Sequence, residues 1–248
     1  MLVKSQVKYI QSLGHKKFRD TYGVFIAEGP KIVSELLTAD NLILSQCFAT
    51  ETWIEQNQSL LEGKEKLVTK IDDQELQRIS FHNSPNQVLA VFSKPRFATV
   101  NKPSGIILLL DTIQDPGNLG TILRTADWFG LKKIVCSEDT VDVFNPKVVQ
   151  SAMGSITRVE LQYTSLQEFI KSNADIPLYA TSLHGEDLDE KIKLSDAFLL
   201  MGNESRGISA DLEHMALKRI RIPKKGGAES LNVAVATGIV LSKIEMIS

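Results

Sequence analysis

Asparagine, serine, glycine and charged residues gather in three segments whose composition could support chemistry. In the first segment, Asn118 and Arg124 lie six residues apart, which is about 600° of rotation along a helix. Their side chains lie on different faces and can converge only if Asn118 caps the helix and Arg124 reaches back toward it. Arginine binds anionic oxygens through its planar N–H donors. An N-cap asparagine beside an ordinary surface arginine would produce the same pattern without any chemistry.

The second and third segments follow apolar runs typical of buried strands. Gly202 ends one such run just before Glu204, and a glycine at a strand end lets a flat ligand approach the backbone. A solvated turn would explain the glutamate equally well. The third segment is a basic loop after Ile222 that ends in Ser230 and Asn232 at a predicted helix start. Free backbone N–H groups at such a start can bind acceptors.

Alternating strand and helix patterns must position these segments. We predict strands at 105–111, 132–137, 158–163, 177–183, 197–202 and 219–223, and helices at 118–129, 145–153, 165–172, 209–217 and 231–247. This alternation predicts an α/β fold with a mostly parallel sheet covered on both faces. Ligands bind beyond the carboxyl ends of strands in such sheets, which is where the three segments fall. The last helix is apolar around most of its circumference, so it faces either a core or, as we favour, a subunit interface.

A proline- and glycine-containing stretch at 93–105 divides the chain. We place a boundary near residue 98, which gives domains 1–98 and 99–248. The first half is a small α/β domain with a helix at 3–13, a strand at 23–27, a helix opened by Pro30, a strand at 42–49, helices at 51–61 and 72–79 and a strand at 87–92.

Composition excludes several classes. The 248 residues are 43% hydrophobic and include two cysteines and four scattered histidines, which predicts neither a disulfide framework nor a metal site. No apolar run reaches the roughly 20 residues that span a bilayer, and the polar start lacks the apolar core of a secretory signal. A cytoplasmic, metal-free protein is expected. The chain has no phosphate-binding loop, no dinucleotide-binding glycine pattern and no nucleophile elbow.

The formal net charge of −2 argues at first against nucleic acid, but the positive charges are clustered. Residues 4–31 hold six Lys and Arg against two acidic residues, and a second basic group stands beside the third segment. Local charge decides whether phosphate binds. The two groups are Lys4, Lys8, Lys16, Lys17, Arg19 and Lys31, and Lys218, Arg219, Arg221, Lys224 and Lys225.

Taken together and in order, the segments resemble the signature motifs of the SpoU-type (TrmH) family of RNA 2′-O-ribose methyltransferases, in the SPOUT superfamily. The matching stretches are Asn118–Ala126, Gly202–Gly207, and Ile222-Pro223 followed by Ser230–Ala236. Residues 144–155, Lys16–Arg19 and Phe25–Gly29 are also similar to the family, so the likeness covers nearly the whole chain. One departure is Leu241-Ser242-Lys243, where family members often carry Leu-Tyr and then a glutamate; it puts interface details in doubt.

The resemblance implies S-adenosylmethionine as methyl donor, an RNA substrate (rRNA or tRNA), a homodimer formed by the C-terminal domain, and a trefoil knot in that domain's sheet. It also implies that the first domain is an RNA substrate-binding domain of ribosomal-protein-like type. The implied catalytic residues are Asn118, Arg124, Glu204, Ser230 and Asn232. The implied cofactor-binding residues are Thr181, Leu183, Gly202, Ile222, Leu231 and Asn232, and the RNA-binding ones are Lys16, Lys17, Arg19 and Arg124.

The resemblance also suggests a role for Arg124 beside the reacting 2′-oxygen or its phosphate. An arginine guanidinium keeps its proton in proteins, which makes a general base demanding, so we favour charge stabilisation and orientation. Two other readings stay open. One is a non-catalytic RNA-binding assembly factor that keeps the fold, and the other is a nucleotide-binding metabolic enzyme, which would lack its usual glycine motif here.

Overall fold

The computed structural model describes residues 2–97, 103–188, 192–203 and 205–246. Within these ranges no helix combines the length and the apolar character needed to cross a membrane. The α-helices are α1 (Lys4–Ser12), α2 (Lys16–Tyr22), α3 (Pro30–Leu37), α4 (Glu51–Gln56), α5 (Gln58–Leu61), α6 (Asp73–Ile79), α7 (Pro116–Trp128), α8 (Pro146–Ala152), α9 (Leu166–Ser172), α10 (Ala210–Glu213) and α11 (Val233–Ser242). Short 3-10 turns are η1 (Glu65–Leu67) and η2 (Met153–Thr157). The strands are β1 (Val24–Glu28), β2 (Leu44–Ala49), β3 (Val68–Lys70), β4 (Val88–Ser93), β5 (Ile106–Leu110), β6 (Lys133–Cys136), β7 (Glu160–Tyr163), β8 (Leu178–Asp187), β9 (Ile192–Leu194), β10 (Ala197–Met201), β11 (Lys218–Arg221) and β12 (Ile244–Met246).

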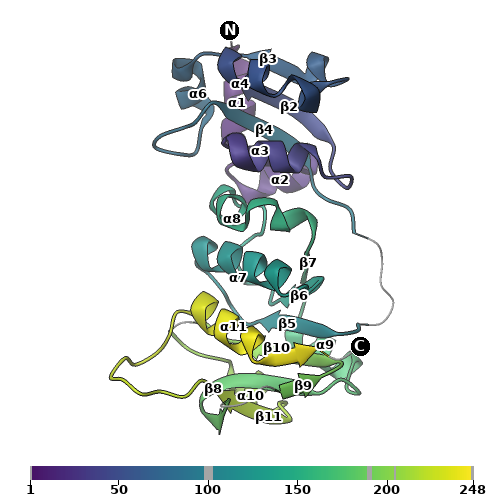
Figure 1. Ribbon diagram of the computed structural model, residues 1–248, viewed down its shortest axis with the longest axis vertical. Helices are drawn as coiled ribbons and strands as arrows, with labels where there is room; N and C mark the ends of the chain where they lie inside the picture. Colours follow the sequence, from purple (N-terminus) through teal and green to yellow (C-terminus); the bar gives the residue numbers. More distant parts are fainter. Residues whose placement is uncertain (1, 98–102, 189–191, 204, 247–248) are drawn as a thin grey trace. The chain divides into compact units, whose positions relative to one another are not determined.

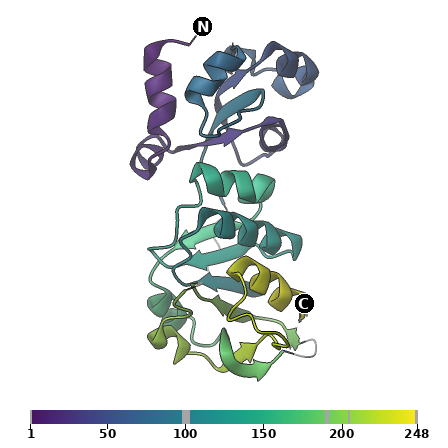
Figure 2. The same ribbon diagram turned by 90° about the vertical axis from the view of Figure 1, so that its left-hand side faces the viewer.

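The chain forms two compact units, and the first comprises Met1–Phe97 together with Asp142–Thr157. Its four-stranded sheet has the order β1-β4-β2-β3, in which β4 is antiparallel to β1 and β2. Alternate strand residues such as Val24 and Ile26 bury one face against Ile10 of α1 and Leu76 of α6. Figure 2 shows α1, in purple, on one side of this sheet and α3 on the other.

The segment Asp142–Thr157 is held in the first unit by polar and aromatic contacts. Arg19 forms an ion pair with Asp142 at 2.6 Å, and the Asn41 amide donates to the Thr157 carbonyl at 2.8 Å. The rings of Phe25 and Phe144 lie 5.2 Å apart. The domain boundary near residue 98 stays a prediction, and residues 98–102 lie outside the described residues.

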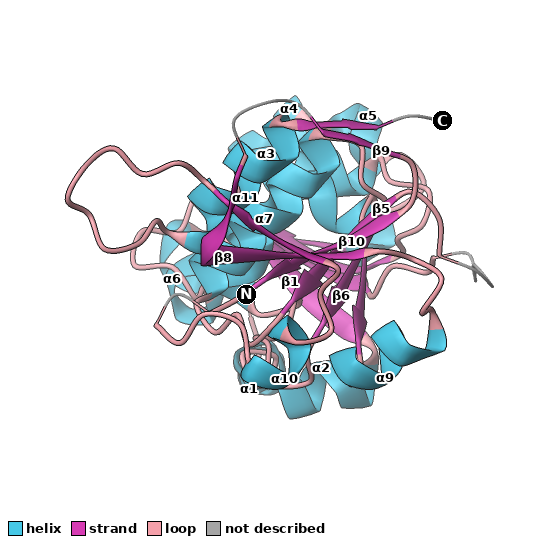
Figure 3. Cartoon of the chain, turned by 90° about the horizontal axis from the view of Figure 1, so that it is seen from below, coloured by secondary structure: helices cyan, strands magenta, loops and turns pink. Residues whose placement is uncertain are grey.

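The second unit contains a six-stranded sheet with the order β11-β8-β10-β5-β6-β7, in which every neighbouring pair is parallel. This confirms the predicted α/β fold with a mostly parallel sheet. The last residues of four strands stand in register, because Met201 pairs with Leu110, Leu110 with Cys136, and Cys136 with Tyr163. Their carboxyl ends therefore form one level edge. Helices α9 and α10 cover one face, and α7 and α11 cover the other (Figure 3).

Strand β8 departs from regular pairing opposite β11. Its register jumps from Ala180, paired with Arg219, to Glu186, paired with Ile220. Residues 181–185 are therefore extra on the β8 side and form a bulge. Gly185 lies so close to the backbone of Arg219 that an added Cβ would meet its carbonyl carbon at 2.6 Å. The bulge places Thr181 and Leu183 outside the regular ladder.

Several local predictions need correction, and one helix was missed. The helix predicted at 209–217 is shorter, because α10 ends at Glu213. Helix α7 begins at Pro116 rather than Asn118, because the Asp115 carboxylate accepts the Asn118 N–H and serves as N-cap. The helix predicted at 231–247 ends at Ser242, after which β12 pairs with β9. The helix predicted at 51–61 is interrupted at Asn57. Helix α2 was not anticipated, because its sequence has little apolar periodicity.

Candidate functional site

The first and third sequence segments meet at the start of two helices. Asn232 donates from Nδ2 to the Oδ1 of Asn118 at 2.9 Å. The same Asn232 side chain is the N-cap of α11, because its Oδ1 accepts from the Ala234 N–H at 2.9 Å. Helices α7 and α11 pack side by side (Figure 1), and a Cβ added at Gly238 would touch Thr125 at 3.8 Å. The two asparagines thus fix the starts of both helices at the carboxyl edge of the sheet.

Arg124 lies on the exposed face of α7. It forms no hydrogen bond or ion pair with any other residue that the structure describes. The structure therefore does not bring Arg124 to Asn118, whose amide is directed to Asn232 instead. Ser230 is also exposed, and Glu204 lies outside the described residues. An exposed guanidinium of this kind is available to an anionic ligand.

The loop after β10 is a tight turn closed on itself. Asn203 and Gly207 exchange backbone hydrogen bonds at 3.0 and 2.9 Å. The Asn203 Oδ1 also accepts from the N–H groups of Ser205 and Arg206. Gly202 lies directly against the backbone of Gly207, leaving no room for a Cβ. The glycine at this strand end is therefore required by the fold itself, beyond any contact with a ligand.

Apolar side chains remain uncovered near the same edge. Leu183 in the β8 bulge is 57% exposed, and Leu231 just before α11 is 45% exposed. Thr181 is anchored, because its hydroxyl donates to the Leu200 carbonyl at 3.0 Å. Ile222, which follows β11, is half-buried. Uncovered leucines beside strand ends and helix starts could hold a ligand with a flat apolar part and polar edges.

The structure separates the predicted RNA-binding cations. Lys16 and Lys17 are exposed on α2, whereas Arg19 is only 2% exposed. The Arg19 guanidinium donates to the carbonyls of Leu13 and Gly14 and to Asp142. Its donors are thus used within the first unit, which leaves Lys16 and Lys17 as the exposed cations of α2.

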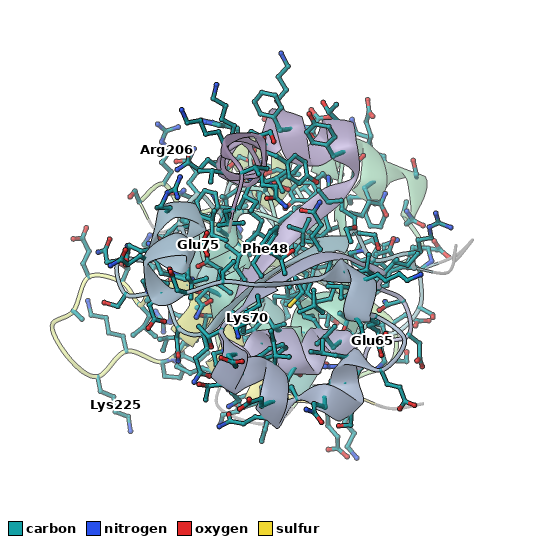
Figure 4. All side chains as sticks on the ribbon, turned by 90° about the horizontal axis from the view of Figure 1, so that it is seen from above. Phe48, Glu65, Lys70, Glu75, Arg206 and Lys225 are labelled. Atoms are coloured by element: carbon teal, nitrogen blue, oxygen red, sulfur yellow. The ribbon has the colours of Figure 1, made fainter. Side chains whose placement is uncertain are left out.

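The second basic group is largely balanced by acidic neighbours. Lys224 and Lys225 are exposed on the loop between β11 and α11, and Lys225 projects away from it (Figure 4). The other three cations form ion pairs: Lys218 with Glu186 at 2.6 Å, Arg219 with Glu213 at 3.4 Å and Arg221 with Asp187 at 2.6 Å. The Arg221 side chain holds the pKa of Asp187 below its usual value. The positive charge beside the site is therefore smaller than the sequence suggests.

One cluster at the sheet edge was missed by sequence reasoning. Asp111, Thr112, Ser137, Asp139 and Asn203 are joined by side-chain hydrogen bonds. The Ser137 hydroxyl lowers the pKa of Asp139. Two short polar runs that directly follow neighbouring strands, Asp111-Thr112 and Ser137–Asp139, were the available signal. Among described residues, no group of three or more His, Cys, Asp or Glu side chains could hold a metal ion.

Two family models and a curated relative match most of the chain. The model of the SpoU rRNA methylase family matches residues 105–242, and that of the MRM3-like substrate binding domain matches residues 4–90. The chain is 32% identical to the 23S rRNA (guanosine(2553)-2′-O)-methyltransferase RlmP of Bacillus subtilis over 95% of this chain and 94% of that protein.

Solved structures give the same result. A TrmH-family protein from Porphyromonas gingivalis superposes with a TM-score of 0.82 at 35% identity, covering 98% of both chains. The AdoMet-bound rRNA methyltransferase from Sinorhizobium meliloti superposes with a TM-score of 0.82 at 31% identity, covering 98% of this chain and 95% of that one. These findings confirm the prediction of an RNA methyltransferase enzyme. The chain belongs to the SpoU rRNA methylase family.

Proposed function

We propose that the protein transfers a methyl group from S-adenosylmethionine to a ribose 2′-hydroxyl of 23S rRNA. The observation that carries this proposal is the Asn118–Asn232 hydrogen bond, which joins the first and third family motifs at the starts of α7 and α11. The name of the B. subtilis relative supports 23S rRNA as the substrate and a ribose oxygen as the acceptor. Among described residues, nothing in the site favours the non-catalytic alternative.

The donor site is proposed at the edge formed by β8, β10 and the loop before α11. S-adenosylmethionine supplies an electrophilic methyl group on a sulfonium when bound. Leu183 and Leu231 are exposed and would pack against the apolar faces of the adenine ring. Backbone at Gly202 and Ile222, together with Thr181 and Asn232, would contact its polar edges. The AdoMet-bound relative from S. meliloti supports this cofactor.

The acceptor must be oriented for in-line attack while negative charge develops on its oxygen. Arg124 supplies a permanent positive charge, because an arginine guanidinium is not deprotonated in proteins. Its guanidinium would bind the 2′-oxygen or the adjacent phosphate and stabilise that charge. Asn118, held by Asn232, would orient the ribose, and Ser230 and Glu204 would help to position the reacting groups.

The first unit is proposed to bind the RNA outside the reacting nucleotide. Lys16 and Lys17 of α2, with Lys4 and Lys8 of α1, give it an exposed basic surface. Phosphate contacts of this kind position a nucleic acid without reading its sequence. The match to the MRM3-like substrate binding domain over residues 4–90 supports this role.

We further propose that the protein is a cytoplasmic homodimer with a knotted C-terminal sheet. Val235 on α11 and Trp128 on α7 are 52% and 86% exposed, which supports a second copy covering these packed helices. A twofold axis would make this patch meet itself. The knot is proposed from the likeness to the TrmH-family protein of P. gingivalis, whose fold this chain shares.

A methyl-transfer assay tests the function. Purified protein and radiolabelled S-adenosylmethionine are incubated with rRNA from cells that lack the protein, since this RNA has an unmodified target. We expect label in 23S rRNA with the wild-type protein and none with the folded Arg124→Ala variant. Label in neither reaction would support the non-catalytic alternative and refute the proposal.

A further inference from the structure

Thr112 adopts a backbone conformation that its side chain disfavours. Its φ is +59°, and among described residues only Gln87 and Met153 share a positive φ without being glycine. A β-branched residue in this region is a genuine outlier. Such outliers persist only where the surroundings hold them, and they gather at functional sites. Thr112 lies at the carboxyl end of β5, the edge where ligands bind in parallel sheets.

Two other loops and the neighbouring Asp111 hold Thr112 in place. Its N–H donates to the Ser137 hydroxyl at 2.8 Å, from the loop after β6. Its hydroxyl lies 3.0 Å from the Asp111 Oδ1 and 3.1 Å from the Asp139 Oδ2. Its carbonyl accepts from the Asn203 Nδ2 at 2.8 Å, from the loop after β10. Every polar group of Thr112 is therefore engaged.

Asn203 uses both ends of its side-chain amide. The Nδ2 reaches Thr112, while the Oδ1 accepts from the N–H groups of Ser205 at 2.8 Å and Arg206 at 3.2 Å. The Asp111 carboxylate adds a parallel link, because its Oδ2 accepts the Ser209 N–H at 2.8 Å. Among side chains, only an amide offers a donor and an acceptor in one short fork. Aspartate would keep the acceptor and lose the donor.

We propose that Asn203 is a positioning residue that locks the loop after β10 to the strained turn after β5. The first loop carries Glu204 and the second leads into α7 with Asn118 and Arg124. The lock fixes the two motif loops relative to each other before substrate binds, which is the condition for in-line transfer. The expected effect on kcat rests on the proposed function. The structural part of the inference, the protection of the Ser205 and Arg206 amides by Asn203, is independent of it.

The test compares Asn203→Asp and Asn203→Ala with Asn173→Ala. Asn173 is a matched control, because its Nδ2 also donates to a backbone carbonyl, that of Phe169, at 2.8 Å. Hydrogen exchange is measured at the amides of Ser205 and Arg206, and kcat and KM for RNA are measured at saturating methyl donor. Both Asn203 variants should lower kcat by roughly 10- to 100-fold with a smaller change in KM.

Exchange at the two amides should be faster in Asn203→Ala and stay near wild type in Asn203→Asp, which keeps the acceptor. Asn173→Ala should lower Tm and leave both readouts unchanged. A wild-type kcat in both Asn203 variants, or unchanged exchange in Asn203→Ala, would overturn the inference. A kcat loss in Asn173→Ala equal to that in Asn203→Ala would also overturn it. If the wild-type protein itself transfers no methyl group, the proposed function fails, while the exchange data still test the lock.

Discussion

Asn232 and Asn118, which are 114 residues apart in sequence, share a hydrogen bond of 2.9 Å between their side chains. The Asn232 Oδ1 is already used as the N-cap of α11, so only its Nδ2 is left to reach Asn118. One side chain thus starts a helix and ties it to the start of α7. The two family motifs that these residues belong to are joined by this bond.

We expect Asn232→Ala to impair both stability and activity. Loss of the N-cap should cost about 1 kcal/mol of unfolding free energy, and loss of the bond to Asn118 should abolish most methyl transfer. Asn145→Ala is the matched control, because Asn145 caps α8 by accepting the Lys147 N–H. It should lose similar stability and keep its activity. Denaturant unfolding measures the stability of each variant, and the methyl-transfer assay measures its activity. Equal activity in the two variants would contradict the role of Asn232.

Mutation of Arg19 should affect the stability of the fold, whereas mutation of Lys17 should affect RNA binding. Arg19→Ala leaves the Asp142 carboxylate unpaired in a site where its partner was 2% exposed, so unfolding free energy should fall by about 3–5 kcal/mol. Lys17→Ala should leave stability unchanged, weaken RNA binding and reduce the salt slope of binding by about 1. Lys66→Ala, an exposed lysine on η1, controls for general charge. A stable Arg19→Ala protein would show that the ion pair is dispensable.

Trp128 reports on association in solution. The chain has two tryptophans, and Trp53 is 1% exposed whereas Trp128 is 86% exposed. If a second copy covers α7 and α11, the emission of Trp128 should shift to shorter wavelength as protein concentration rises. In sedimentation, the Val235→Lys protein should remain monomeric. Val3 lies in the first unit and is similarly exposed, so the Val3→Lys control should still form the dimer. A dimer with unchanged affinity in Val235→Lys would place the interface elsewhere.

Both cysteines should be inert in the folded protein. Burial raises the pKa of Cys47 to about 12 and raises that of Cys136 as well. The thiolate is the reactive form, so at pH 8 a thiol reagent should modify neither residue until denaturant is added. Methyl transfer should survive the treatment. Rapid labelling of a thiol in the native protein would show that one of these positions opens to solvent.

Local patterns predicted most of the elements, because helices and strands follow from nearby residues. The strand predicted at 105–111 and the helix predicted at 145–153 correspond to β5 and α8. The start of α7 was misplaced because both Asp115 and Asn118 are suitable N-cap residues. In the structure Asp115 is the N-cap and Pro116 is the first helical residue. Contacts between distant residues could not be predicted from spacing. Arg19 was assigned to RNA because nothing in its neighbourhood reveals that Asp142, 123 residues away, neutralises it.

The site was predictable as a set of segments and much less so as a geometry. The family motifs predict Asn118, Arg124 and Asn232 as site residues, but the bond between the two asparagines depends on how α7 and α11 pack. The positive φ of Thr112 could not be predicted for the same reason. Its conformation is imposed by Ser137, Asp139 and Asn203, which come from two other loops.

The most direct test of the proposed function is a map of 2′-O-methylated riboses in 23S rRNA from cells with and without this protein. We predict that one methylation disappears when the protein is removed, returns with the wild-type chain, and fails to return with Arg124→Ala produced at the same level. Identical maps in the presence and absence of the protein would contradict the assignment of rRNA ribose methylation to this chain.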